Sequence, residues 1–172
     1  MCDNIKMENI IVRASGVLVW NGKEYRCALG KGGISENKKE GDGATPAGTF
    51  PLCEVYYRAD RVSKINAALP THILNENNGW CDDISDLNYN RHVKLPYAAS
   101  HENLWREDHL YDIIVVVGYN DDPPIPGKGS AIFIHIARPE FTPTDGCIAL
   151  AQEDLIEILG SADSKTMVLI KN

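Results

Sequence analysis

The stretch AIFIHIARPEFTPTDGCIAL, residues 131–150, joins two apolar segments and carries a potentially reactive side chain beside each. The first apolar run leads into His135, and Cys147 stands directly before Ile148, Ala149 and Leu150. β-Branched and aromatic residues favour buried strands, so we expect residues 131–137 to form one. The stretch therefore predicts a β-rich core with a histidine and a cysteine at its margin.

These residue types supply the parts of a cysteine acyl-transfer enzyme. A thiol attacks a carbonyl as thiolate, and an imidazole that takes its proton or pairs with it raises the reactive fraction, a role that His135 fits. The backbone amides of Gly146 and Cys147 are the local candidates for stabilising the oxyanion. The structural alternative is that Cys147 is a buried packing residue, because free cysteines are often buried.

Two motifs resemble the L,D-transpeptidase (YkuD-type) catalytic domain family. His135 followed by Thr144-Asp145-Gly146-Cys147 is similar to the family's histidine, short spacer and Ser/Thr-x-Gly-Cys motif. Residues 40–50, EGDGATPAGTF, are similar to its DG-x-TP-x-G-x-F element. The resemblance covers the chain from about residue 10 to the C-terminus. It implies a mainly β, β-sandwich-like catalytic fold with a few short helices.

The chain departs from the family pattern at three points. Ile136-Ala137 replaces the glycine or serine that many members have after the histidine, so the group that orients the imidazole is left open. Ala149 stands where many members have an arginine suited to a substrate carboxylate. The histidine-to-cysteine spacer is also short for the family. We expect carboxylate recognition to have moved to one of three other arginines: Arg138, Arg91 or Arg106.

The composition is typical of a soluble globular protein, and the length predicts one domain over residues 1–172. At 19.0 kDa the chain is long enough to bury a core without disulfides. Its net charge of −7 disfavours nucleic acid and anionic membranes as partners. No stretch approaches the length of a membrane span, and no motif indicates a cofactor. The sequence leaves the oligomeric state open.

Residues 1–8, MCDNIKME, carry acids where a secretion signal needs net positive charge. The five cysteines are an odd number without framework spacing, which fits a reducing compartment. We therefore expect a cytoplasmic protein, or a periplasmic one if the chain is a trimmed form of a longer sequence.

Turn signals and apolar periodicity outline the remaining elements. Asn21-Gly22 between residues 17–20 and 23–29 predicts a hairpin with a type I′ turn. Strands are expected at 49–57, 111–119 and 166–171, with a helix at 152–159 that ends at Gly160. Residues 30–48 read as a long loop, and the irregular segment 60–106 reads as an insertion that forms a substrate wall.

Other candidate site residues have structural alternatives. If the insertion borders the cleft, Trp80 and Arg91 are binding candidates. If it does not, Trp80 covers the core and Arg91 is a solvated surface residue. Thr144 and Asp145 are assigned to the substrate side, although Asp145 more naturally shapes its turn than orients His135. No histidine or cysteine spacing matches a zinc pattern, so no metal is expected.

The resemblance implies attack by Cys147 on the carbonyl that links diaminopimelate to the terminal D-alanine of a peptidoglycan stem tetrapeptide or muropeptide, with His135 as base. The resulting thioester passes to an amine (transpeptidation) or to water (L,D-carboxypeptidase activity), and a cytoplasmic location favours water. One competing hypothesis is a non-catalytic module that binds wall peptides. Another is a cysteine hydrolase with an unrelated substrate.

Overall fold

A computed structural model describes residues 9–172. The predictions for the N-terminal segment 1–8, including Cys2, fall outside these residues. The described chain contains fourteen strands and one helix, which confirms the mainly β prediction, with one helix where a few were expected. The elements are β1(Ile10–Arg13), β2(Val17–Trp20), β3(Lys23–Ala28), β4(Ile34–Ser35), β5(Thr45–Pro46), β6(Gly48–Tyr57), β7(Thr71–Ile73), β8(Asn78–Cys81), β9(His92–Lys94), β10(His101–Asn103), β11(Ile113–Val117), β12(Phe133–Ile136), β13(Ile148–Leu150), α1(Gln152–Leu159) and β14(Met167–Lys171).

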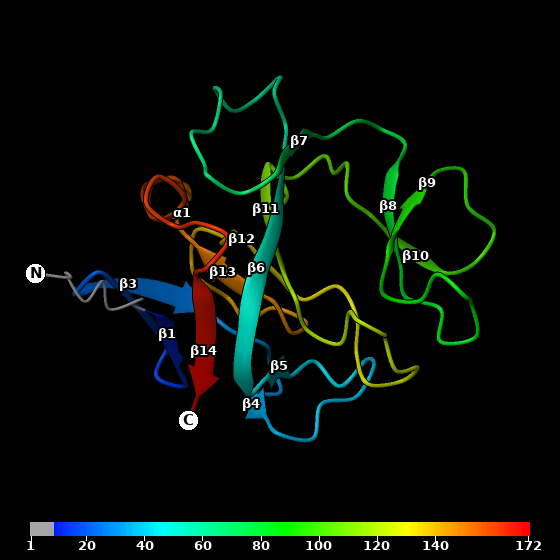
Figure 1. Ribbon diagram of the computed structural model, residues 1–172, viewed down its shortest axis with the longest axis horizontal. Helices are drawn as coiled ribbons and strands as arrows, with labels where there is room; N and C mark the ends of the chain where they lie inside the picture. The colour runs from blue at the N-terminus through cyan, green and yellow to red at the C-terminus, as the bar shows by residue number, and fades with distance from the viewer. Residues whose placement is uncertain (1–8) are drawn as a thin grey trace, which may run out of the picture.

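Nine strands form one bent sheet in the order β11-β12-β13-β3-β2-β1-β14-β6-β7, and β11 also pairs with β6. The long strand β6 pairs with β14 through its first half and with β11 through its second half. Strand β3 pairs with both β2 and β13 in the same way. These two shared strands divide the sheet into the two layers of a sandwich-like fold, and β6 crosses the middle of the view in Figure 1.

The strongest local signals in the sequence are confirmed. Asn21 and Gly22 have φ angles of 48° and 75°, as a type I′ turn between β2 and β3 requires. Helix α1 has the predicted bounds and carries Glu153 and Asp154 in its first turn, where carboxylates favour the helix dipole. Its buried residues Leu155, Ile158 and Leu159 belong to the main core.

The main core fills the space between the two layers. It takes Ile113 and Val115 from β11 and Ile134 and Ile136 from β12, all fully or nearly fully buried. Because side chains alternate along a strand, the neighbouring residues of β11 and β12 point to the opposite face. That outer face carries Phe133 and His135, and it too is covered.

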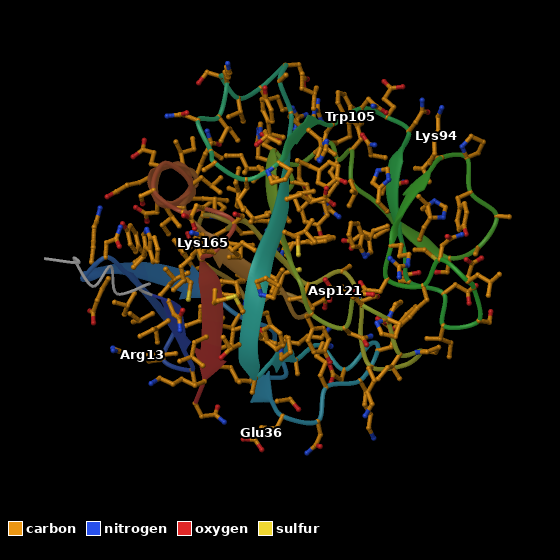
Figure 2. All side chains as sticks on the ribbon, in the orientation of Figure 1. Arg13, Glu36, Lys94, Trp105, Asp121 and Lys165 are labelled. Atoms are coloured by element: carbon orange, nitrogen blue, oxygen red, sulfur yellow. The ribbon has the colours of Figure 1, made fainter. Side chains whose placement is uncertain are left out.

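The insertion supplies this cover. Strands β8, β9 and β10 form a separate three-stranded sheet in the order β10-β8-β9, which lies to one side of β6 in Figure 1. The ring of Trp80 in β8 packs edge-on against the ring of Phe133, with 5.2 Å between the two ring centroids. Both residues belong to a second apolar cluster. Figure 2 shows side chains filling the space between β6 and the small sheet, with Trp105 on the side of β6 and Lys94 on the small sheet.

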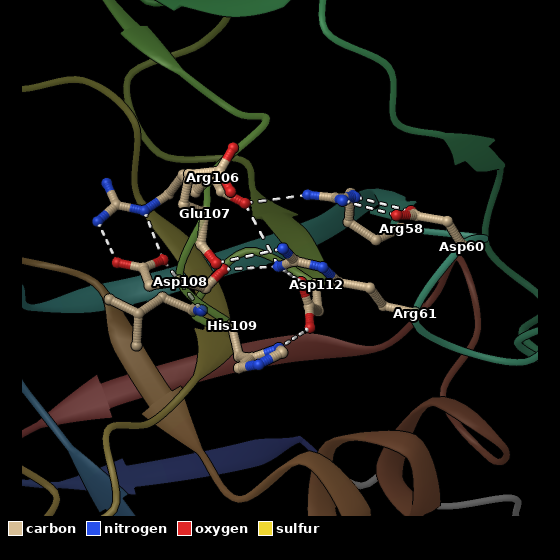
Figure 3. Close-up of polar contacts among 9 residues, drawn as sticks. Arg58, Asp60, Arg61, Arg106, Glu107, Asp108, His109 and Asp112 are labelled. Carbon is tan, nitrogen blue, oxygen red and sulfur yellow. Dashed lines mark hydrogen bonds and ion pairs between the residues drawn. The ribbon is translucent and has the colours of Figure 1, made fainter.

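An arginine network holds the end of the insertion in place (Figure 3). Arg58 donates to the carbonyl oxygen of Arg106 at 2.9 Å. Arg61 donates to the carbonyl oxygens of Glu107 and Asp108 and forms an ion pair with Asp112 at 2.9 Å. Together these hydrogen bonds tie down the backbone of residues 106–108, of which Arg106 lines the candidate site.

No helix among residues 9–172 is long and apolar enough to cross a membrane.

Candidate active site

Cys147 and His135 share one face of the sheet. Strands β12 and β13 run parallel with Ile134 opposite Ile148 and His135 opposite Ala149, which brings Cys147 beside Phe133. The Phe133 amide donates to Cys147 Sγ at 3.4 Å. Because residues two apart on a strand point to the same side, His135 projects on the same face as Phe133 and Cys147. Both side chains line one cavity of about 230 Å³.

The surroundings of Cys147 favour the protonated thiol. Its side chain is 9% exposed, and Sγ donates to the carbonyl oxygen of Ala131 at 3.2 Å. Burial raises the pKa of Cys147 to about 12, and the negative charge of Glu102 acts in the same direction. The sequence left open whether the imidazole takes the thiol proton or pairs with a thiolate, and the enclosed sulfur opposes a resting thiolate.

His135 is held as a neutral imidazole. Its Nδ1 lies 2.9 Å from the carbonyl oxygen of Ile136, and because a carbonyl only accepts, Nδ1 carries the ring proton and leaves Nε2 free to accept another. Burial lowers the pKa of His135 to about 4, with Arg106 and Arg138 adding to the effect. The Tyr111 ring packs edge-on against the imidazole, with 5.2 Å between the two ring centroids. The carbonyl of Ile136 is thus the orienting group that the sequence left open.

The turn before Cys147 is closed by Thr144. Thr144 Oγ1 donates to the carbonyl oxygen of Cys147 at 2.6 Å and accepts from the Gly146 amide at 3.1 Å. Gly146 has a φ of 140°, and a Cβ there would lie 2.9 Å from the carbonyl oxygen of Ala44, so the position requires glycine. The Gly146 amide is therefore already engaged, contrary to its expected oxyanion role. The Cys147 amide has no acceptor among the described residues.

The upstream motif supports this turn. Asp42 Oδ1 accepts from the Ala44 amide at 2.8 Å and from Lys38 Nζ at 2.6 Å, which makes Asp42 a turn former. Thr45 Oγ1 accepts from the Gly30 amide, and a bridge joins Gly30 to Thr144. The two motifs recognised in the sequence therefore meet in space, the upstream motif packing against the turn that carries Cys147.

Residues 8–170 match the family model of the L,D-transpeptidase catalytic domain. This chain belongs to that family. Comparisons with curated proteins and with solved structures gave no match.

In this L,D-transpeptidase domain the three candidate arginines lie in different surroundings. Arg138 lines the Cys147 cavity, is exposed, and forms no ion pair with any described residue. Arg106 also lines it but is paired through two nitrogens with Asp108, at 2.9 and 2.6 Å. Arg91 borders a different cavity. Arg138 is thus the arginine whose charge remains open to a ligand.

Two more predicted binding residues are placed differently from the expectation. Trp80 is buried, donates a hydrogen bond to Asn90 Oδ1 at 3.0 Å and packs on Phe133, so it supports the sheet beneath the site. It borders the cavity that contains Arg91 and not the cavity that contains Cys147. Asp145 lies at the rim of the Cys147 cavity and pairs with Lys31 at 2.7 Å. It makes no hydrogen bond to His135, whose Nδ1 is bound to the Ile136 carbonyl.

Sequence reasoning missed several cavity residues. They come from the glycine-rich loop, the insertion, the residues just before β11 and the loop between β11 and β12: Lys38, Glu40, Asp82, Glu102, Tyr111 and Ser130. Only the assignment of segment 60–106 as a substrate wall indicated this region, and it named no acidic residue. Residues 9–172 contain no group of three or more histidine, cysteine or acidic side chains arranged to hold a metal.

The protonated state of Cys147 predicts slow alkylation of the free protein. With its pKa raised to about 12 by burial, the thiolate fraction stays small at neutral pH, so we expect iodoacetamide to label Cys147 more slowly than a free cysteine, with a rate that climbs as pH rises above 9. Intact-mass spectrometry with peptide mapping measures this. Rapid labelling at pH 7 would show that the resting thiol is ionised.

Proposed function

We propose that this domain is a cysteine acyl-transfer enzyme that cleaves the bond between diaminopimelate and D-alanine in peptidoglycan stem tetrapeptides. The observation that carries the proposal is the placement of Cys147 and His135 on one face of the β12–β13 pair, lining one cavity. Membership of the L,D-transpeptidase family supports the substrate class.

In the first half-reaction His135 Nε2 accepts the thiol proton while Sγ bonds to the substrate carbonyl carbon. The carbonyl oxygen becomes an oxyanion, for which the free Cys147 amide is the nearest identified donor. When the oxyanion collapses, the carbon–nitrogen bond breaks and the imidazolium returns its proton to the departing D-alanine amine. A thioester on Cys147 and a neutral His135 remain.

In the second half-reaction His135 takes a proton from the attacking group as that group bonds to the thioester carbonyl carbon. The carbon–sulfur bond then breaks, and the imidazolium returns the proton to Sγ. Water gives a tripeptide and a free thiol, and an amine gives a new amide bond and a free thiol. We propose that hydrolysis dominates if the protein works in the cytoplasm, where water competes with few wall-bound amines.

Arg138 is proposed as the carboxylate-binding residue, because it is the cavity arginine without an ion-pair partner in the described chain. We expect Arg138→Gln to raise KM for the tetrapeptide by roughly 10-fold, the cost of losing one exposed charge-assisted hydrogen bond, with a smaller change in kcat. Steady-state assays of D-alanine release measure it. Arg91→Gln is the matched control and should leave KM unchanged, since Arg91 lies on the other cavity.

The function is tested by incubating the purified chain with a tetrapeptide stem and identifying the products by mass spectrometry. Tripeptide and D-alanine are the expected products, with a cross-linked peptide when an amine acceptor is added. Calorimetric binding of the peptide without any product would instead support the non-catalytic module, and turnover of an all-L peptide would support an unrelated cysteine hydrolase.

A further inference from the structure

The charges that line the Cys147 cavity are unevenly compensated. Two of its cations have their own carboxylate partners: Lys38 pairs with Asp42 at 2.6 Å and Arg106 pairs with Asp108 at 2.6 Å. Among the lining acids, Asp145 is paired with Lys31, and Glu40 accepts from the Tyr89 hydroxyl at 2.5 Å. The other three lining carboxylates, Glu40, Asp82 and Glu102, form no ion pair with a described residue, and two of them, Asp82 and Glu102, come from the insertion.

The register of the small sheet aims both carboxylates at the site. Strands β8 and β10 are antiparallel with Trp80 opposite Glu102, and the Asp82 amide donates to Ser100 just beyond the strand end. Opposite residues in such a pair project to the same face, and so do residues two apart on one strand. Trp80 packs on Phe133, so this shared face is the one that meets the main sheet. Asp82 and Glu102 accordingly line the cavity of Cys147.

The protein gives a hydrogen bond to one of these carboxylates and leaves an oxygen of the other without a partner. Glu102 accepts a hydrogen bond from the buried Tyr111 hydroxyl, and burial raises the Glu102 pKa. The Asp82 Oδ1 atom is enclosed and has no hydrogen-bond partner among the described residues. An enclosed carboxylate oxygen without a hydrogen-bond partner is costly, and a ligand that donates to Asp82 Oδ1 would remove that cost.

We propose that Asp82 and Glu102 form a subsite for an ammonium group of the bound peptide. This rests on the proposed function and adds a substrate feature to it. With Arg138 on the same cavity, the site presents a cation to a carboxylate and two anions to an ammonium, which suits a zwitterionic end group. The ammonium has two possible sources: the free amine of diaminopimelate in the donor stem, or the amine of the acceptor.

Binding to the Cys147→Ala chain tests the donor source without requiring turnover. The probes are a tetrapeptide with a free diaminopimelate amine and the same peptide with that amine acetylated. If the donor supplies the ammonium, calorimetry should show the free-amine peptide bound roughly 10- to 100-fold more tightly, the range for a hydrogen bond to a charged group. Adding Glu102→Gln or Asp82→Asn should remove most of that preference.

The acceptor source is tested with the chain that retains Cys147. Adding glycinamide to the tetrapeptide reaction makes transfer compete with hydrolysis, and the ratio of the two products is read by mass spectrometry. If the acceptor supplies the ammonium, Glu102→Gln should lower that ratio roughly 10-fold.

Glu107→Gln is the matched control, because Glu107 is exposed and its side chain does not line the cavity. It should keep the wild-type values, and circular dichroism should show that all variants are folded. The subsite is overturned if neither Glu102→Gln nor Asp82→Asn changes the binding preference or the product ratio, or if neither peptide binds. The two proposals can fail separately. If Cys147→Ala prefers the free-amine peptide but the chain that retains Cys147 never releases D-alanine, the proposed reaction is refuted and the subsite stands.

Discussion

Replacing Cys147 with alanine is expected to lower kcat/KM for D-alanine release by at least about 10³-fold, because no other nucleophile is proposed to form the thioester. The structure also predicts that the variant folds. The thiol makes only a 3.2 Å hydrogen bond to the Ala131 carbonyl oxygen and accepts one of 3.4 Å from the Phe133 amide. The Thr144 hydroxyl closes the turn by binding backbone atoms of Gly146 and Cys147, which the substitution retains. Mass spectrometry of the products and a thermal melt measure the two effects.

Cys53 provides the matched control for this experiment. It is a partly buried thiol whose sulfur lies 3.9 Å from Asp121 Oδ2, and it borders the separate cavity that contains Arg91. Cys53→Ala should therefore retain wild-type turnover. Undiminished release of D-alanine by Cys147→Ala would refute the assignment of the nucleophile, and the thermal melt separates loss of chemistry from loss of fold.

The parts of the fold that the sequence could predict are those with local causes. Asn21-Gly22 adopts the positive φ angles that the turn needs, and α1 has its predicted bounds because apolar spacing, early acids and Gly160 all agree. The short strands β7, β8, β9 and β10 were not predicted. Their partners are set by long-range pairing and by packing on the outer face of the main sheet, which no local pattern encodes.

The residues of the candidate site were likewise predictable only where their causes are local. His135 lies in β12, and Cys147 directly precedes the parallel neighbouring strand β13. Once these two strands are recognised in the sequence and paired, the two residues are expected to lie close together. The choice among the arginines could not be made, because it depends on Asp108 occupying Arg106 and on Arg91 facing another cavity. Asp82 and Glu102 were missed for a similar reason, since only the register of β8 with β10 turns them toward the thiol.

Burial also decides how the nucleophile is activated. A thiol whose pKa is raised to about 12 and an imidazole whose pKa is lowered to about 4 do not form a standing ion pair near neutral pH. In the proposed mechanism the proton is instead transferred when the substrate carbonyl begins to accept charge. This makes the base as indispensable as the sulfur, and its replacement gives the second large effect.

We expect His135→Gln to reduce kcat/KM by roughly 10²- to 10⁴-fold, the range for loss of a positioned general base. Glutamine is of similar polarity but cannot accept the thiol proton. In the unsubstituted chain the base works only when neutral, so activity should be lost as pH falls through its pKa. Because burial lowers that pKa to about 4, kcat/KM should stay level from neutral pH down to about pH 5 and decline only below it.

The shape of this acid limb separates a buried base from an open one. A decline centred near the ordinary histidine value of about 6.5 would show that the imidazole is solvated during turnover, contrary to its 5% exposure and its contact with Tyr111. His72→Gln is the control, since His72 is exposed, pairs with Glu54 at 3.0 Å and does not line the cavity. Its rate and pH profile should match those of the unsubstituted chain, and full activity in His135→Gln would remove the imidazole from the mechanism.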